Sequence, residues 1–219
     1  MRSAKISKSD RQICKAVLGI KGLVSQGEVV SEILRKTDPH ILFVSISQEQ
    51  VDGLSQFLRE PFEMNLSDYE IIYGVRLSKY GEVMTPPPIY TEAVKFSEER
   101  GVPIIGLDMN EAEYSDSYQK NVGAFSLIRH SLRKRSMLRK DYKDSDPYSF
   151  VDAWGRQMDR VKALKNVDLE RARYMASVFE QKVSEIDGEA FMIFDYELWP
   201  KFKHSLQNLG YHVDEDQIP

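Results

Sequence analysis

Cysteine is almost missing from this sequence of 219 residues. The one cysteine, Cys14, excludes a disulfide bond within the chain and a zinc site built on several cysteines. Long apolar runs are missing too, because no stretch approaches the ~20 apolar residues that cross a bilayer. Residues 1–10 also contain no apolar run, so we expect no secretory signal. These absences predict a cytoplasmic protein without a membrane partner.

A large excess of one charge is also missing. The formal net charge is -4, and hydrophobic residues (42%) and charged residues (29%) occur in proportions that are ordinary for a globular protein. The length suits a single α/β domain over residues 1–219, which buries roughly 70% of the surface of the unfolded chain.

One basic cluster stands out from this balance. It consists of Arg129, Arg133, Lys134, Arg135, Arg139 and Lys140. No aromatic residue lies between its two ends, whereas binding of single-stranded nucleic acid uses basic and aromatic side chains together. Because the whole chain is acidic, we interpret the cluster as the solvated face of a helix and expect no nucleic acid partner.

The common catalytic signatures are absent. The sequence has no G-x-S-x-G elbow, no H-E-x-x-H helix, no Walker loop and no G-x-G-x-x-G turn. Its four histidines stand singly at positions 40, 130, 204 and 212, which favours surface or hydrogen-bonded roles over metal binding. Gly19-Ile-Lys-Gly22 has the form of a phosphate-cradling loop before a helix, but such glycine pairs more often make ordinary turns.

The N-terminal half predicts a strand–helix–strand unit. Residues 13–20 are β-prone, and residues 41–46 form the continuous apolar run that is typical of a strand buried on both faces. The intervening helix is expected to begin at Ser25, whose spacing to Glu28 fits a capping box, and to end near Asp38. Two strands joined in this way indicate a right-handed crossover in a parallel sheet.

The rest of the chain alternates helical and strand patterns. We expect helices at residues 48–58, 89–100 (after three prolines, ending at Gly101) and 198–209, and strands at residues 102–108 and 190–195. Residues 69–77 fit either a helix or a strand. Residues 113–186 show only helical patterns, with breaks expected at 143–147 and 165–168. The fold class is therefore α/β: a central, largely parallel or mixed sheet with flanking helices and a helical lobe inserted before the last strands.

Polar residues follow the predicted strands. In open α/β sheets, ligands bind outside the carboxyl ends of the strands. The turn from Gly19 to Gly22, Ser45, Asp108 and the segment from Asp195 to Glu197 are expected at this edge. Two carboxylates there could act as a general acid and a general base if their environments separate their pKa values. The alternative is that Asp108 and Asp195 each cap the helix that follows.

The order of these elements resembles the TraB/TIKI family, which includes pheromone-shutdown proteins and belongs to a larger group classed as metal-dependent hydrolases. That family has a G-x-x-H turn after its first strand, and Gly19-Ile-Lys-Gly22 stands in its place, with Gly22 at the histidine position. The family then has a proline, matched by Pro39, and a strand ending in Val-Glu-Leu, where this chain has Val44-Ser45-Ile46.

The resemblance continues to the C-terminus. The family's Gly-x-Glu motif and its strand ending in Asp-Arg correspond to residues 87–109, where Ala93 and Asp108 agree but Ile89 replaces the glutamate. Glu170-Arg171-Ala-Arg-Tyr-Met175-Ala176 is the closest match, to a Glu-Arg followed by Met-Ala. The last Gly-x-x-His turn falls so that Glu197 takes the histidine position.

The resemblance implies a TraB-like α/β domain without the usual metal-site side chains. It therefore implies a catalytically degenerate regulator (a pseudoenzyme) that binds a small anionic ligand, a peptide or a protein in the old cleft without a cofactor. The candidate ligand-binding residues are Gly19, Gly22, Ser45, Asp108 and Arg171, and Arg171 could instead form an internal ion pair with Glu170 or Asp108.

Two alternatives remain open. The first is a working hydrolase or peptidase with a rearranged site, in which Asp108, Glu170 and Glu197 are catalytic and hold a divalent metal such as manganese. The second is a structural protein that self-associates, as family members often do, through the aliphatic and aromatic residues of the stretch 69–77.

Overall fold

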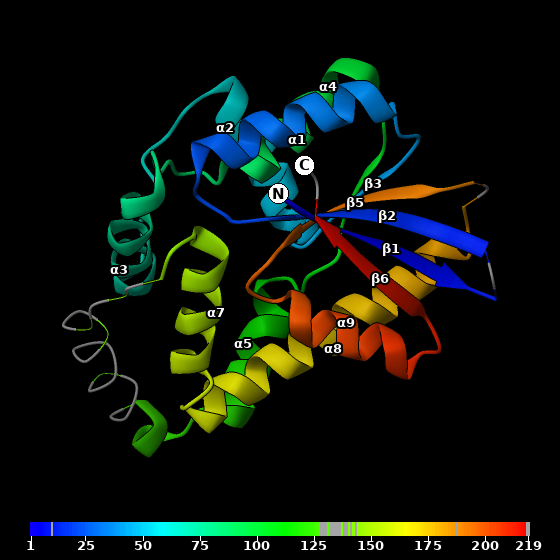
Figure 1. Ribbon diagram of the computed structural model, residues 1–219. Helices are drawn as coiled ribbons and strands as arrows, with labels where there is room; N and C mark the ends of the chain where they lie inside the picture. The colour runs from blue at the N-terminus through cyan, green and yellow to red at the C-terminus, as the bar shows by residue number, and fades with distance from the viewer. Residues whose placement is uncertain are drawn as a thin grey trace.

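The computed structural model describes residues 1–9, 11–127, 131, 137, 140, 142, 144–186 and 188–217. Its centre is a mixed sheet of six strands in the order β4-β3-β5-β2-β1-β6, with helices on both faces (Figure 1). The strands are β1 (Arg2–Lys8), β2 (Arg11–Gly19), β3 (Leu42–Val44), β4 (Ile104–Gly106), β5 (Ala190–Asp195) and β6 (His212–Gln217). The predicted α/β fold with flanking helices is confirmed.

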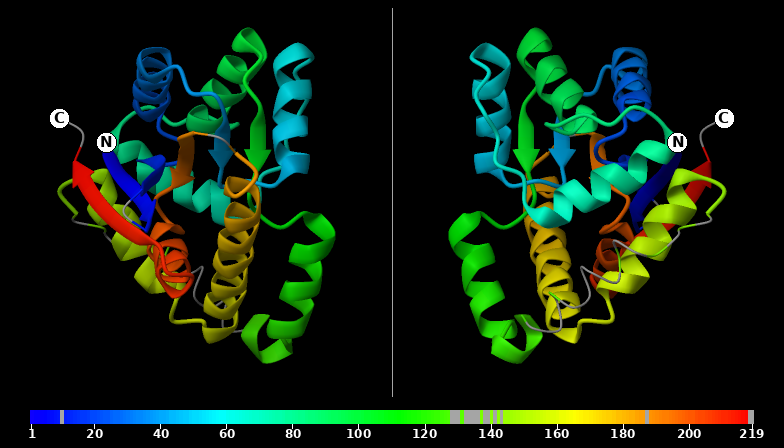
Figure 2. Two further views of the ribbon diagram at one scale, coloured as in Figure 1. Left: turned by 90° about the vertical axis from the view of Figure 1, so that its right-hand side faces the viewer. Right: turned by 90° about the vertical axis from the view of Figure 1, so that its left-hand side faces the viewer.

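The helices fall into two groups along the chain. The first group is α1 (Val24–Thr37), α2 (Gln48–Arg59), α3 (Asp68–Leu77), the short 3₁₀ turn η1 (Ser78–Tyr80) and α4 (Pro88–Arg100). The second group is α5 (Glu111–Asn121), α7 (Pro147–Met158), α8 (Lys162–Val183) and α9 (Trp199–Asn208). The second group contains the predicted helical lobe, in which α5 and α8 extend together away from the strands (Figure 2).

Four of the strands, β4, β3, β5 and β2, run parallel. The unit β2–α1–β3 is parallel as predicted, but β5 lies between its two strands and pairs with both. All six residues of β5 are buried, so this strand belongs at the centre of the sheet, where both faces are covered. The central strand of the sheet is thus formed by residues near the C-terminal end of the chain.

The alternation of side chains along β5 divides the core into two layers. Ala190, Met192 and Phe194 pack with residues of α7, α8 and α9. Phe191 and Ile193 point to the other face and pack with residues of α1, α2 and α4. This period of two is what a strand imposes, and it places one hydrophobic layer on each side of the sheet (Figure 1).

The edge of the sheet that contains β1 and β6 was not predicted. Both strands pair antiparallel, β1 with β2 and with β6, and this makes the sheet mixed. In β1 only Ala4 and Ile6 face the core, and in β6 only Val213 is a buried apolar residue. One or two apolar positions in a polar strand give a weak signal, so β1 is defined by its pairing with β2, and β6 by its pairing with β1.

Two expectations about helix ends are wrong. Helix α1 begins at Val24 without a side-chain cap, so Ser25 and Glu28 lie inside its first turns and do not form a capping box. Helix α8 runs unbroken through residues 165–168. The break near residue 147 is confirmed over residues 144–147, because Asp146 caps α7 by accepting hydrogen bonds from the backbone N–H groups of Tyr148 and Ser149.

The stretch 69–77, which the sequence left open, is helical and belongs to α3. Tyr73 and Leu77 point inward, while Ile71 (51% exposed) and Val75 (64% exposed) face solvent. The basic cluster of residues 129–140, apart from Lys140, lies outside the described residues, and so does His130. Among the helices that the structure describes, none combines the length and the hydropathy needed to cross a membrane.

Candidate functional site at the carboxyl edge of the parallel strands

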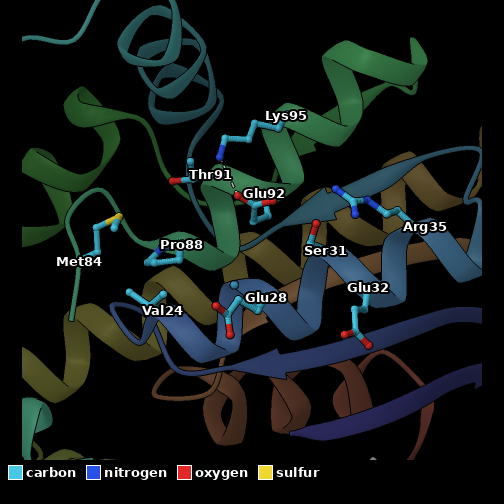
Figure 3. Close-up of a pocket in the computed structure, with 11 residues that line it drawn as sticks. Val24, Glu28, Ser31, Glu32, Arg35, Met84, Pro88, Thr91, Glu92 and Lys95 are labelled. Atoms are coloured by element: carbon cyan, nitrogen blue, oxygen red, sulfur yellow. Dashed lines mark hydrogen bonds and ion pairs between the residues drawn. The ribbon is translucent and has the colours of Figure 1, made fainter. Parts of the chain in front are cut away.

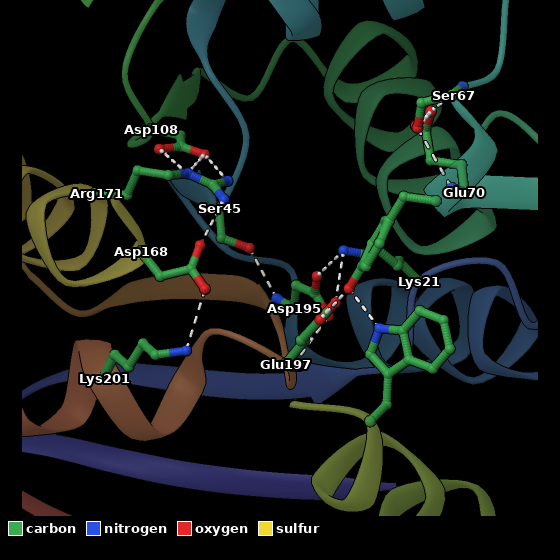
Figure 4. A network of polar contacts seen from close by, with 12 residues as sticks. Lys21, Ser45, Ser67, Glu70, Asp108, Asp168, Arg171, Asp195, Glu197 and Lys201 are labelled. Atoms are coloured by element: carbon green, nitrogen blue, oxygen red, sulfur yellow. Dashed lines mark hydrogen bonds and ion pairs between the residues drawn. The ribbon is translucent and has the colours of Figure 1, made fainter. Parts of the chain in front are cut away.

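The carboxyl ends of the parallel strands carry the polar groups expected there. Figure 4 shows Ser45 (after β3), Asp108 (after β4) and Asp195 (at the end of β5) gathered at one edge of the sheet, with Lys21 from the turn after β2. Because these strands are parallel, their carboxyl ends meet, and residues from four distant parts of the sequence come together. The predicted placement of the candidate site is thus reproduced in its main features.

A buried lysine organises one half of this edge. Lys21 Nζ lies 2.9 Å from Asp195 Oδ2 and 2.9 Å from Glu197 Oε2 (Figure 4). Both carboxylates are buried, with side chains 4% and 12% exposed, whereas the Lys21 side chain is 30% exposed. One ammonium therefore faces two carboxylates, and the group of three carries a single negative charge when both carboxylates are ionised.

The two carboxylates of this group differ in acidity. Burial raises the pKa of Asp195, although Lys21 opposes the shift. Burial also works against the charged form of Glu197, but Lys21 and the Tyr69 hydroxyl together hold the pKa of Glu197 below its ordinary value. Burial would lower the pKa of Lys21, but its two carboxylate neighbours raise that pKa well above the ordinary value. Lys21 is therefore a fixed cation and is not a nucleophile.

Helices α3 and α7 close one side of this group with aromatic residues. Tyr69 from α3 donates a 2.6 Å hydrogen bond to Glu197 Oε1. The same hydroxyl accepts a hydrogen bond from the indole N–H of Trp154 in α7. The Tyr69 hydroxyl thus has both a donor and an acceptor partner, and it links two helices to the end of β5.

Tyr73, one turn later in α3, differs from Tyr69. It is 4% exposed, and its hydroxyl has no hydrogen-bond partner among the described residues. Its ring centroid lies 5.6 Å from Lys21 Nζ. Burial, together with the charges of Glu197 and Asp195, raises the pKa of Tyr73 well above its ordinary value, so this hydroxyl keeps its proton.

Ser45, a predicted ligand-binding residue, joins two strand ends. Its hydroxyl oxygen accepts a 2.7 Å hydrogen bond from the backbone N–H of Asp195 and lies 2.8 Å from the Tyr90 hydroxyl. Ser45 is 3% exposed. Its hydroxyl is therefore occupied within the protein and fixes where Asp195 begins the turn that carries Glu197.

The other half of the edge is built around Arg171 of α8. Its Nε lies 3.2 Å from Asp108 Oδ2 and 3.3 Å from Oδ1, and its Nη1 lies 3.4 Å from Asp168 Oδ1. Asp168 also accepts from Lys201 Nζ at 3.1 Å, and Lys201 reaches Asp159 at 2.9 Å. Burial disfavours the charged guanidinium, but Asp108 outweighs burial and raises the pKa of Arg171 above its ordinary value. The internal ion pair predicted for Arg171 is present with Asp108.

Neither aspartate caps the helix that follows it. The residue before α5 whose side chain accepts from the helix is Asn110, and α9 has no side-chain cap. Asp108 accepts instead from the N–H of Met109, and Asp195 from the N–H of Glu197. The capping prediction is therefore wrong: both carboxylates turn back to bind their own loops and a neighbouring cation.

Glu170, predicted as a catalytic partner of Asp108 and Glu197, has other partners. It accepts hydrogen bonds from Ser117 Oγ (2.6 Å) and Lys120 Nζ (2.9 Å), both on α5. These hydrogen bonds lower the pKa of Glu170 to about 2. Glu170 therefore ties α8 to α5 in the helical lobe. Within the described part of the chain, no three His, Cys, Asp or Glu side chains are arranged to hold a metal ion.

The glycines of the first turn have conformational roles. A Cβ at Gly19 would lie 2.9 Å from Ile89, so this position must remain small for α4 to pack on β2. Gly22 has φ of +97°, which glycine adopts without strain. The N–H of Val24, at the start of α1, donates to Glu82 O at 3.0 Å. The two glycines thus serve the backbone conformation and packing of an ordinary turn. The side chain of this turn that reaches the edge carboxylates is Lys21.

Lys21, Tyr69 and Tyr73 were missed as site residues. Lys21 lies between the two glycines of the candidate turn, and a lysine at the end of one strand is a natural partner for carboxylates at the end of another. This signal was available in the sequence. The contribution of α3 was not, because nothing local shows which helix covers the edge.

A second hollow lies away from this edge. It is a groove of about 540 Å³ between α1 and α4, where Gly27 lets Pro88 approach closely (Figure 3). Its charged lining residues are Glu28, Glu32, Arg35, Glu92 and Lys95. Glu92 is paired with Lys95 at 2.7 Å. The groove is lined by exposed and half-buried side chains of both signs and contains none of the predicted site residues.

No family model matches the chain, and no curated protein is similar to it at a significant level.

Proposed function

We propose that this chain is a TraB-like protein that binds a small ligand or a peptide segment at the carboxyl edge of its parallel strands, without a metal ion. The observation that carries the proposal is the pairing of the edge carboxylates with the chain's own cations. Lys21 lies between Asp195 and Glu197, and Arg171 lies between Asp108 and Asp168.

This pairing favours binding over metal-dependent hydrolysis. A divalent metal needs several carboxylate or imidazole ligands that converge on one point and are free to bind it. Here an ammonium and a guanidinium occupy the positions between the carboxylates, and Glu170 points its carboxylate to α5. The residues present therefore do not fit a metal.

The charge balance of the edge indicates the class of ligand. Its linked ion pairs contain three cations, Lys21, Arg171 and Lys201, and five carboxylates, Asp108, Asp159, Asp168, Asp195 and Glu197. The carboxylates are in excess by two. An anion entering this region would be repelled, so we propose a neutral or cationic ligand in place of the anionic one suggested by the sequence.

A metal-free acid–base enzyme is the second candidate. The specific observation in its favour is that Asp195 and Glu197, held on one lysine, have pKa values shifted in opposite directions. Such a pair can supply a general acid and a general base. It predicts hydrolysis of an ester or amide substrate in the presence of EDTA that is lost in Asp195→Asn and in Glu197→Gln.

Binding at the edge can be tested directly. The protein would be titrated in EDTA with acetamide, methylammonium and acetate while its backbone amide signals are followed by NMR. The proposal expects shifts for the residues that follow β2, β3, β4 and β5 with a neutral or cationic probe. Shifts confined to other regions, or a stoichiometric metal that is recovered with the protein and bound through Asp108 or Glu197, would contradict it.

A further inference from the structure

The hydroxyl of Tyr73 is the one polar group next to the Lys21–Asp195–Glu197 cluster that the described chain leaves unsatisfied. It is buried on α3, and its ring packs against Tyr69, Phe150 and Trp154. A buried hydroxyl without a partner loses the hydrogen bonds it made in water, and native proteins rarely leave such a group unpaired. It therefore indicates a partner from outside the chain.

The cluster contains two hydrogen-bond donors that its contacts within the described chain leave unused. Lys21 has three N–H groups, and its two ion pairs use two of them. The Tyr69 hydroxyl donates its one hydrogen to Glu197 and accepts a hydrogen bond from Trp154, so it has no donor left for a ligand. Tyr73 keeps its O–H, and Lys21 keeps one N–H. A group that accepts hydrogen bonds would satisfy both of these donors.

Charge restricts which acceptor can bind. The cluster already contains two buried carboxylates and only one ammonium, so a third anion would have to be desolvated next to a net negative charge. A neutral oxygen acceptor avoids this cost.

Resting on the binding function proposed above, we propose that the cluster binds a neutral carbonyl oxygen, such as that of a peptide or other amide, through the Tyr73 hydroxyl and the Lys21 ammonium. The chemical class of the ligand is thus an uncharged amide and not a carboxylate or phosphate.

The way in passes beside α3. Lys21 is 30% exposed, so solvent reaches the cluster at this side chain. Residues 61–67, which lead into α3, are all exposed and have no regular secondary structure. Because Tyr73 is 4% exposed, a ligand that reaches its hydroxyl requires α3 to shift on the side of this segment.

The experiment compares two probes of the same shape and different charge, acetamide and acetate, on three proteins in EDTA. The proteins are the full chain, its Tyr73→Phe variant and a Tyr211→Phe control. Tyr211 is also a buried tyrosine, but its ring lies 4.4 Å from Lys8 Nζ, among other residues. Binding is measured by NMR titration, and stability by thermal unfolding.

The proposal expects acetamide to bind more tightly than acetate and to shift the signals of Lys21 and Glu197. Tyr73→Phe is expected to weaken acetamide binding by about three- to tenfold, the usual size of one lost hydrogen bond, and to leave the melting temperature equal or higher. Tyr211→Phe is expected to leave acetamide binding unchanged.

Three results would overturn it. Acetate binding as tightly as acetamide would refute the charge argument, and unchanged acetamide binding in Tyr73→Phe would remove the residue from the site. A lower melting temperature in Tyr73→Phe would show that the hydroxyl has a structural partner such as an internal water. If acetamide shifts residues at the strand ends but Tyr73→Phe changes nothing, only this inference fails. If no probe reaches the strand ends, the binding function fails as well.

Discussion

Lys21 and Glu197 are 176 residues apart in the sequence, and their charged groups lie 2.9 Å from each other at the end of the central strands. Asp195 shares the same ammonium. This pairing determines the electrostatics of the candidate site, because it turns two buried carboxylates into a group with one net charge.

Removing the ammonium with Lys21→Met is expected to lower the free energy of unfolding by about 3 kcal/mol at pH 7, since two buried carboxylates lose their counter-ion. Burial already raises the pKa of Asp195, and without the opposing charge of Lys21 this pKa rises further above its value in the unfolded chain. Such a group favours folding at low pH, so the deficit should shrink as the pH falls from 7 towards 5. Urea unfolding at the two pH values measures this.

The matched control is Lys36→Met. Lys36 makes an exposed pair with Glu32 within α1, and such pairs contribute little. It should change stability by less than about 0.5 kcal/mol at either pH. A Lys21→Met deficit that is equal at both pH values would mean that the lost interaction is packing of the side chain and not charge.

The Arg171–Asp108 pair should distinguish arginine from lysine. Arg171→Ala leaves the buried Asp108 carboxylate without its cation and should cost about 3 kcal/mol in unfolding free energy. Arg171→Lys keeps the charge but cannot reach both Asp108 and Asp168 with a planar group, so it should recover only part of that loss. Arg173→Ala, an exposed position on the same helix, should be close to neutral. Equal stabilities of the alanine and lysine variants would argue against the bidentate role.

Glu170 should contribute to stability in acid. Its pKa is about 2 in the folded protein and near 4.3 in an unfolded chain, so the unfolded state binds more protons between these values. Its contribution is therefore complete above pH 5 and is lost as the pH falls towards 2. Glu170→Gln should reduce the difference in unfolding free energy between pH 7 and pH 3. If the variant and the parent lose equal stability over that range, the hydrogen bonds to Ser117 and Lys120 do not stabilise the charged form.

Alanine substitutions at two glycines test how closely α2 approaches β4, the strand that precedes Asp108. A Cβ at Gly106 in β4 would lie 2.4 Å from the backbone nitrogen of Gln48, and the neighbouring backbone cannot yield. Gly106→Ala should cost about 3 kcal/mol and displace Asp108 from Arg171. Gly53→Ala, within α2 and with open space around it, should stabilise the protein by about 0.5 kcal/mol through helix propensity. Thermal unfolding of both variants provides the comparison, and a neutral Gly106→Ala would show that β4 and α2 can separate.

Local patterns in the sequence determined much of the fold. The strand at residues 190–195 is found with the predicted bounds, because six consecutive apolar or strand-ending residues are buried on both faces. Helix α4 begins at the last of three prolines and ends before Gly101, which has φ of +67°. These signals depend only on a residue and its near neighbours, so they can be recognised without knowledge of the rest of the chain.

Strand order, by contrast, came only from the tertiary structure. Nothing local indicates that β5 enters between β2 and β3, or that β1 and β6 extend the sheet with one or two apolar residues each. These strands are stabilised by the partners they meet, and the partners are distant in sequence. Helix α8 likewise continues through residues 165–168, where Val167 is buried against Val122 and Val161.

The candidate site divides in the same way. The sequence by itself placed Ser45, Asp108 and Asp195 at one edge, because parallel strands must end together. Only the tertiary structure decided which cations pair with which carboxylates: Lys21 contacts two of them and Arg171 contacts two others. It also decided that Glu170 faces α5 and that the buried hydroxyl of Tyr73 lies near this edge. Charges and hydroxyls act through space over a few ångströms, and the fold alone determines which of them come that close.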